Sequence, residues 1–286
     1  MLNALLLSLT TVGISAQAIL KKAYNGKTGR RGVFAFCAIS VLFAAFFFLA
    51  AGGFRLDFAW EVVPYSLGFS LAFGVTLVMS VLAIKLGSLS LTSLISSYSL
   101  VIPTFYGLFF LGEQAGSFFY PGLLLLGISL FLINGKCMAD GRITLPWMAA
   151  AFLTFLGNGV CSTVQTVQQK TFHGQYKSEM MTLALLIVAI SVGALSLVFE
   201  RKDIARAAKR GGAFAAACGL INGGSNLLVM LLAVRMNASI MFPVLSAGGI
   251  LLTGAVSIFF YKERLAKRQY AALILGTASV VLMNLP

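Results

Sequence analysis

The sequence predicts an all-α membrane protein with ten transmembrane helices, arranged as two inverted five-helix repeats. Three observations lead to this prediction. The 286 residues are 59% hydrophobic and only 10% charged, with a mean hydropathy of +0.95, whereas soluble domains carry about 25% charged residues. Apolar runs of membrane-spanning length recur along the whole chain. A passage of the first half also reappears in the second.

Each apolar run is near 20 residues long, which is the length that crosses a bilayer as a helix. The runs lie at residues 2–20, 33–51, 62–84, 88–111, 118–135, 145–168, 179–199, 213–234, 239–261 and 268–285. We interpret the first run as a retained span rather than a signal peptide, because it lacks a basic region before it. The connectors are too short for a soluble catalytic or nucleic-acid-binding domain.

The repeat appears when residues 68–134 are aligned with residues 218–284 without a gap. The shared glycine and polar positions are Gly74 and Gly224, Ser96 and Ser246, Glu113 and Glu263, Tyr120 and Tyr270, Ser129 and Ser279, and Asn134 and Asn284. We therefore divide the chain into units 1–138 and 143–286. Because each unit has five spans, an odd number, the second enters the membrane from the opposite side. Inverted repeats of this kind are typical of secondary transporters.

Charge predicts the orientation. Seventeen of the 21 Lys and Arg residues lie in connectors after odd-numbered runs, including Lys21 and Lys22 after the first. Cytoplasmic loops of membrane proteins collect Lys and Arg, so we expect these connectors in the cytoplasm and both termini outside a plasma membrane. The same rule explains the net charge of +13 without a nucleic-acid partner.

Two short motifs carry a family resemblance. A glutamate follows the fourth and ninth runs in FFLGEQ and FFYKER, and the next spans read YPGLLLLGISLFLIN and YAALILGTASVVLMN. With the duplicated ten-span layout, the whole chain resembles the ten-helix, EamA-type branch of the drug/metabolite transporter superfamily. The resemblance implies a solute carrier whose central cavity is lined by the first, third, fourth, sixth, eighth and ninth helices. The motifs identify an architecture rather than a substrate.

Polar side chains at helical spacing mark candidate binding faces. Thr10 and Gln17 share one side of the first helix, and Asn158, Ser162 and Gln165 share one side of the sixth. A shift of 148 residues superimposes Thr10 on Asn158 and Gln17 on Gln165. Facing lipid, these groups would be unsatisfied. They either line a wet cavity or hold helices together, and the sequence leaves both alternatives open.

The eighth helix carries two stripes. Ala215, Gly219 and Gly223 form a small-residue stripe suited to close helix packing, and Asn222 and Asn226 form a polar stripe beside it, which we assign to the cavity. The matching face of the third helix carries Thr76 and Ser80.

The fourth and ninth helices each contain a proline, Pro103 and Pro243, which bends a helix and frees carbonyl groups. Ser96 and Tyr98 precede the first proline, and Ser246 follows the second. Ser96 and Ser246 are equivalent across the repeat, so we include all three residues in the candidate substrate site.

Ionisable groups are predicted at helix ends. Glu113 and Glu263 would lie on opposite faces of the membrane, so we expect them to terminate helices and bind connector backbone rather than form an acid/base pair. The single histidine, His173, and the absence of HExxH and GxSxG motifs argue against hydrolytic sites. Trp60 and Trp147, near span starts, are interpreted as interfacial anchors.

These observations predict a secondary transporter that moves a small neutral or zwitterionic metabolite by alternating access, without a metal or cofactor, as a monomer or homodimer. One alternative is an exporter of amphipathic drug-like compounds. A lipid scramblase or an intramembrane enzyme is an alternative from a different class.

Overall fold

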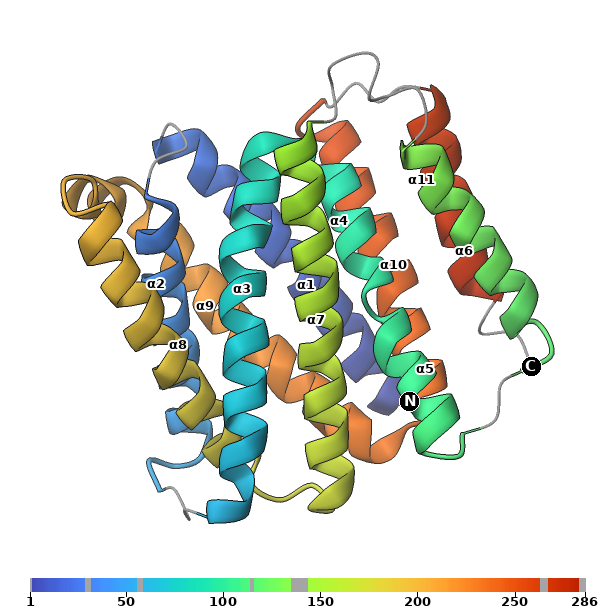
Figure 1. The fold of residues 1–286 in the computed structure, drawn as a ribbon, viewed down its shortest axis with the longest axis horizontal. Helices are drawn as coiled ribbons and strands as arrows, with labels where there is room; N and C mark the ends of the chain where they lie inside the picture. The colour runs from blue at the N-terminus through green and yellow to red at the C-terminus, as the bar shows by residue number, and fades with distance from the viewer. Residues whose placement is uncertain are drawn as a thin grey trace.

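A computed structural model describes residues 2–28, 32–55, 59–113, 116–134, 144–262 and 267–282. Within these ranges the chain forms helices and no strand, as predicted. The elements are α1 (Leu2–Thr28), α2 (Val33–Ala51), the 3-10 turn η1 (Trp60–Val62), α3 (Val63–Leu86), α4 (Leu89–Tyr98), α5 (Val101–Phe110), α6 (Phe119–Asn134), α7 (Leu145–Thr171), α8 (Lys177–Phe199), α9 (Ile204–Arg235), α10 (Ala238–Phe259) and α11 (Lys267–Leu282) (Figure 1).

Eight helical segments of the described chain are long and apolar enough to cross a membrane, with α4 and α5 counted together as Leu89–Phe110. Two shorter apolar helices lie within α6 and α11. Large apolar side chains cover much of the outer surface, and Phe109, Phe110, Phe259 and Phe260 are each at least 75% exposed. Such a surface requires lipid around it, so the chain is a multi-pass membrane protein.

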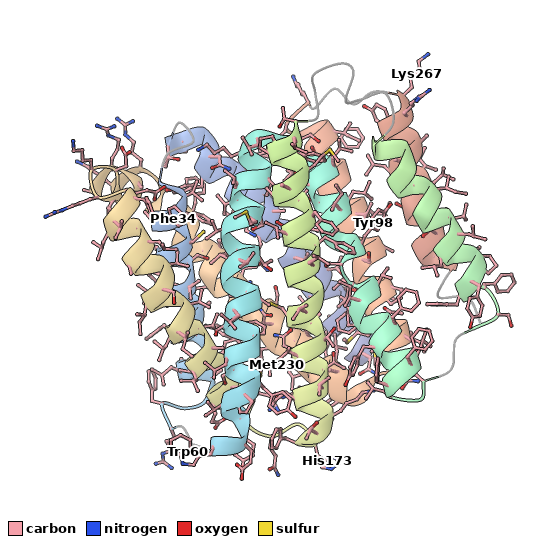
Figure 2. The ribbon with its side chains drawn as sticks, viewed as in Figure 1. Phe34, Trp60, Tyr98, His173, Met230 and Lys267 are labelled. Atoms are coloured by element: carbon pink, nitrogen blue, oxygen red, sulfur yellow. The ribbon has the colours of Figure 1, made fainter. Side chains whose placement is uncertain are left out.

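The packing places α1 against α9 and α3 against α7 in the middle of the bundle, with α2 between α8 and α9 on one side (Figure 1). Helix α10 packs on α1, α4 and α5. Helices α6 and α11 pack on each other at the opposite edge of the bundle. The side chain of Lys267 lies at one end of the helices, and those of Trp60 and His173 lie at the other (Figure 2).

The small-residue stripe of α9 packs as predicted. A Cβ atom added to Gly219 would lie 2.1 Å from the backbone oxygen of Ser40 on α2. One added to Gly223 would lie 2.7 Å from the ring of Phe47, also on α2. Only residues without a β-carbon permit α2 and α9 to approach this closely.

The first helix is longer than its apolar run. Helix α1 continues to Thr28, eight residues past the predicted end at residue 20, because Lys21, Lys22 and Ala23, which follow the apolar run, are residue types that favour a helix. The assignment of Lys21 to a connector is therefore wrong. Helix α9 likewise begins at Ile204, nine residues before the predicted start of its apolar run at residue 213.

The predicted fourth span is broken. Helix α4 ends at Tyr98 and α5 begins at Val101. Pro103 has no N–H to donate to the carbonyl of Ser99, and the amide of Ile102 donates to that oxygen instead, at 3.1 Å, in a tighter turn. Helix α10 contains Pro243 and yet runs unbroken from Ala238 to Phe259.

Trp147 is not an interfacial anchor. It is only 2% exposed, and its indole Nε1 donates to Thr92 Oγ1 at 3.1 Å, which links α7 to α4. Gly87 makes room for this ring, because a Cβ atom there would lie 2.2 Å from the indole nitrogen. Trp60, by contrast, is 78% exposed, as an interfacial position requires.

Candidate functional site

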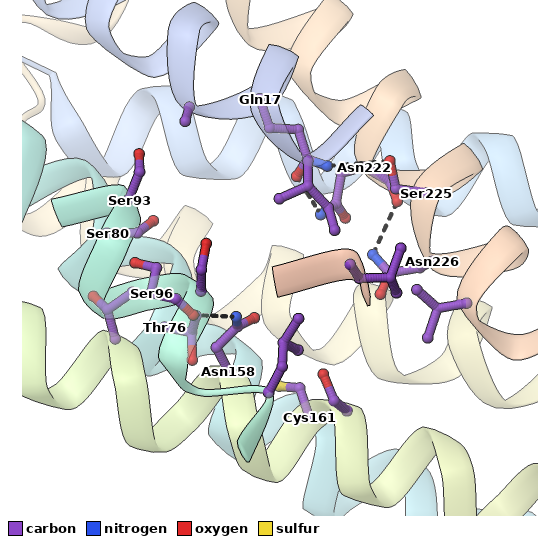
Figure 3. A pocket seen from close by; sticks show the side chains of 18 of the residues that line it. Gln17, Thr76, Ser80, Ser93, Ser96, Asn158, Cys161, Asn222, Ser225 and Asn226 are labelled. Atoms are coloured by element: carbon purple, nitrogen blue, oxygen red, sulfur yellow. Dashed lines mark hydrogen bonds between the residues drawn. The ribbon is translucent and has the colours of Figure 1, made fainter. Parts of the chain in front are cut away.

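A polar cavity of about 160 Å³ lies inside the bundle, between α1, α3, α4, α7, α9 and α10 (Figure 3). Its polar lining consists of Gln17, Lys21, Thr76, Ser80, Thr92, Ser93, Ser96, Ser97, Thr154, Asn158, Ser162, Gln165, Asn222, Ser225, Asn226 and Thr253. Apolar side chains such as Phe73 and Phe242 complete the wall.

Nine of the twelve residues proposed from the sequence line this cavity. They are Gln17, Thr76, Ser80, Ser96, Asn158, Ser162, Gln165, Asn222 and Asn226. The structure therefore brings the polar faces of α1, α7 and α9 to one place.

The other three residues lie away from the cavity and bind protein groups. Thr10 Oγ1 donates to the carbonyl of Leu6 in its own helix at 2.7 Å. The Tyr98 hydroxyl is hydrogen-bonded to Ser129 Oγ on α6 at 2.6 Å, and Ser246 Oγ donates to the carbonyl of Ser97 at 2.7 Å. None of the three is among the residues that line this cavity. Tyr98 and Ser246 join neighbouring helices, whereas Thr10 is bonded within its own helix.

A chain of amide hydrogen bonds crosses one wall of the cavity. Gln165 Nε2 donates to Asn226 Oδ1 at 2.8 Å, and Asn226 Nδ2 donates to the backbone oxygen of Asn222 at 2.9 Å. Asn222 Nδ2 in turn donates to Gln17 Oε1 at 2.8 Å (Figure 3). Gln17 and Gln165, which the repeat superimposes, are thus the two ends of one network.

Asn158 braces the break between α4 and α5. Its Nδ2 donates to Ser99 Oγ at 2.8 Å and lies 3.4 Å from the carbonyl oxygen of Ser96 (Figure 3). Gly159 permits this contact, because a Cβ atom at that position would lie 2.8 Å from the carbonyl oxygen of Ser99. The irregular backbone that Pro103 imposes therefore lies beside the cavity and is held by a cavity residue.

Sequence reasoning missed the one charged group. Lys21 lines the cavity, and its Nζ donates to Ser80 Oγ on α3 at 2.8 Å. The helical spacing could have identified it, since Lys21 follows Gln17 by four residues and shares its face. It was overlooked because the apolar run ends before it. Ser93, Ser97 and Ser225 were also missed, and no pattern separates them from the many other serines.

Two polar atoms of the cavity wall have no hydrogen-bond partner among the described residues. They are Ser93 Oγ and Asn222 Oδ1, and both are buried. Leaving a buried polar atom unsatisfied is costly, so water or a ligand in the cavity is the natural partner for each.

Glu113 lies outside the cavity, after the end of α5, and it binds the first backbone amides of α10 rather than connector backbone. Its Oε1 accepts from Lys170 Nζ at 2.6 Å and from the amide of Ala238 at 3.0 Å, and Oε2 accepts from the amide of Ser239 at 2.8 Å. Glu113 thus joins the ends of α5 and α7 to the start of α10. Its repeat partner, Glu263, lies outside the described residues.

Fold and cavity together define a multi-pass α-helical membrane protein with a polar chamber enclosed by six of its helices. A crystal structure whose title names no function has a similar fold, with a TM-score of 0.65 and 13% sequence identity, over 96% of this chain and 95% of the other. No protein-family model and no curated protein matches the sequence.

Proposed function

We propose that this protein is a secondary transporter of the EamA-type architecture, which moves a small neutral or zwitterionic metabolite across the plasma membrane by alternating access. The observation that carries the proposal is the cavity, whose lining residues come from both halves of the chain. A site at the interface between two repeats can be opened to either side of a membrane when one half rocks against the other.

The helix packing supports ten spans in two inverted repeats. In this reading α1, α2, α3, α4 with α5, and α6 form the first unit, and α7 to α11 form the second. Helix α1 packs on α9 as α7 packs on α3, and α2 packs on α9 as α8 packs on α3. Helix α1 packs on α10 as α7 packs on α4 and α5. Each of these helix pairs in the first unit thus has a corresponding pair when the helices of one unit are replaced by their counterparts in the other.

The size of the cavity favours a small metabolite over a drug-like compound. Pockets for drug-sized ligands measure roughly 300–1,000 Å³, and this cavity has about 160 Å³. An engineered cavity of about 150 Å³ admits benzene, so a ligand of about six non-hydrogen atoms fits without a change in the protein. Exporting a larger amphipathic compound would require a more open state.

The proposal is tested with purified protein in two steps. A thermal-shift screen against amino acids, nucleosides, sugars and amines identifies a ligand, because a ligand that binds only the folded state raises its stability. The hit is then tested for exchange across proteoliposome membranes. We expect protein-dependent exchange of the stabilising solute and no flipping of labelled lipid. Lipid flipping without solute exchange would identify a scramblase instead.

A further inference from the structure

The cavity contains an ammonium group, and the described lining supplies no opposite charge to balance it. Of the described residues that line the cavity, Lys21 is the charged one, and none is Asp or Glu. The ion pairs between Lys170 and Glu113 and between Arg206 and Asp203 lie outside the cavity. Lys21 is partly buried, and an anion entering this cavity would form a charge-assisted contact with its ammonium group.

The geometry leaves part of Lys21 free to bind. An ammonium group has three N–H donors, and one is directed at Ser80 Oγ at 2.8 Å. Ser80 Oγ gives its own hydrogen to the carbonyl of Leu77 at 2.9 Å, so it acts on Lys21 purely as an acceptor. Ser80 therefore fixes the position of the ammonium group and leaves its other donors for the cavity.

We propose that Lys21, held by Ser80, is the anchor for a carboxylate of the transported solute. This inference rests on the proposed function and narrows its substrate class. A carboxylate carries one negative charge and matches a single ammonium group. A phosphate ester carries about 1.5 to 2 negative charges at neutral pH and would call for a second cation, which the described lining lacks. The unpartnered hydroxyl of Ser93 supplies a further neutral donor.

The anchor also defines what the cavity disfavours. A cationic amine would meet the ammonium of Lys21 with no carboxylate to offset the repulsion. A zwitterion remains compatible, because Asn222 Oδ1 is a buried acceptor without a partner among the described residues and can accept an N–H group. A ligand with no charge would leave Lys21 unpaired, and we expect it to bind less tightly.

Four small probes of similar size test the anchor. Butyrate and butyramide have the same shape and differ in charge, propylphosphonate presents a phosphoryl-type group, and butylamine is a cation. Binding is measured by thermal stabilisation of the purified protein at several probe concentrations. A hydrogen bond to a charged group contributes enough for a preference of about tenfold to a hundredfold, so butyrate should bind that much more tightly than butyramide, with butylamine weakest.

Variants then assign the preference to Lys21. Lys21→Met should reduce the butyrate-to-butyramide ratio to about one, while Lys21→Arg should retain the preference. The matched control is Lys22→Met, which removes the same charge one residue along, where Nζ lies 4.7 Å from the centre of the Tyr261 ring and not on the cavity. Melting temperatures measured without probe show whether each variant is folded.

Several results would overturn the assignment. These are no stabilisation by butyrate, equal binding of butyrate and butyramide, tighter binding of propylphosphonate, or loss of the preference in Lys22→Met as well as in Lys21→Met. Failure of the proposed function looks different. In that case the carboxylate preference and its dependence on Lys21 persist, while proteoliposomes exchange no solute.

Discussion

At the scale of single residues, Asn226 links two helices of the cavity wall through hydrogen bonds. It accepts a hydrogen bond from Gln165 on α7 and donates to the backbone of Asn222 in its own helix, α9. Both links depend on the carboxamide, and removing it frees a buried donor on Gln165, which is only 2% exposed. The Asn226 carboxamide therefore both links α7 to α9 and contributes polar atoms to the cavity wall.

We predict that Asn226→Ala weakens binding of the solute found by thermal-shift screening. A lost hydrogen bond contributes about 0.5 to 1.5 kcal/mol, and more when its partner stays unsatisfied, so the dissociation constant should rise by about three- to tenfold or more. Titration of purified protein measures this change. The control is Ser279→Ala on α11, since that hydroxyl is buried and has no hydrogen-bond partner among the described residues. Equal effects of the two substitutions would show that the amides only pack helices.

Glu113 provides a second prediction, which concerns stability. Burial raises the pKa of its carboxyl group, but the hydrogen bonds from Lys170 and from the amides of Ser239 and Ala238 outweigh that effect and hold the pKa below its usual range. Because the carboxylate is bound by Lys170 of α7 and by two backbone amides of α10, Glu113→Gln should lower the free energy of unfolding by about 1 to 3 kcal/mol. Thermal unfolding in detergent measures this loss.

The stability lost in Glu113→Gln depends on pH in a direction that the lowered pKa of Glu113 determines. A carboxyl group whose pKa is lower in the folded state stabilises the protein above its unfolded pKa, and the contribution disappears as the pH falls through the folded value. The difference between wild type and Glu113→Gln should be constant above about pH 5 and shrink below about pH 4. Glu61→Gln, at an exposed position, should show neither the loss nor the pH dependence. A difference that grows in acid would contradict the ion-pair assignment.

Residue spacing predicted the cavity lining where long polar side chains continue a helix face, and it did not separate lining hydroxyls from hydroxyls outside the cavity. Gln17, Asn158 and Gln165 keep the spacing of their faces and line the cavity. Thr10 has the same register as Asn158 in the repeat but returns its hydroxyl to Leu6. A short hydroxyl side chain can be satisfied by its own helix, whereas a carboxamide reaches further.

At the scale of elements, the contact between α2 and α9 depends on the absence of side chains. We predict that Gly219→Ala destabilises the protein by about 1 to 3 kcal/mol, the usual cost of overpacking, because the new Cβ atom would lie 2.1 Å from a backbone oxygen of Ser40 that has no room to move. Thermal unfolding of the purified variant measures the change.

Gly212 in the same helix is the matched control. A Cβ atom there meets nothing within 4 Å, and alanine favours a helix over glycine by about 1 kcal/mol. Gly212→Ala should therefore leave the melting temperature unchanged or raise it. If both substitutions had the same effect, helix propensity rather than the close approach of α2 and α9 would control this position.

Helix ends were less predictable than the helices themselves. Apolar runs located every long helix, because burial in lipid demands a minimum apolar length. They did not locate the last turns of α1, which are polar and still helical, and the charged group of the cavity lies in those turns. Hydropathy also did not predict the break between α4 and α5. Pro103 and Pro243 both lie in apolar sequence, yet the helix is interrupted next to Pro103 and is continuous through Pro243.

At the scale of the whole molecule, the two ends of the bundle differ. Glu113 ties the end of α5 to the start of α10, and α10 has 22 residues, so its far end lies about 33 Å away at the usual helical rise. The connectors that follow α5 and α10 are therefore at opposite ends of the protein. Lys267 and His173 mark these two ends (Figure 2).

The charge distribution predicts which end faces the cytoplasm. Lys267 lies at the end of the protein to which the sequence assigns seventeen of the 21 Lys and Arg residues, and His173 lies at the end to which it assigns four. Both positions are exposed, so a cysteine at either one is open to reagents. The test requires a background without the native cysteines, which are Cys37, Cys137, Cys161 and Cys218.

We predict that an impermeant maleimide labels His173→Cys in intact cells and leaves Lys267→Cys unlabelled, because positively charged connectors are retained on the cytoplasmic side during insertion. After permeabilisation both variants should label to the same extent, which controls for local accessibility. The opposite pattern would place the basic end outside and both termini in the cytoplasm. Labelling of both variants in intact cells would mean that the chain inserts in two orientations, and the bias of seventeen to four would then be too weak to fix its topology.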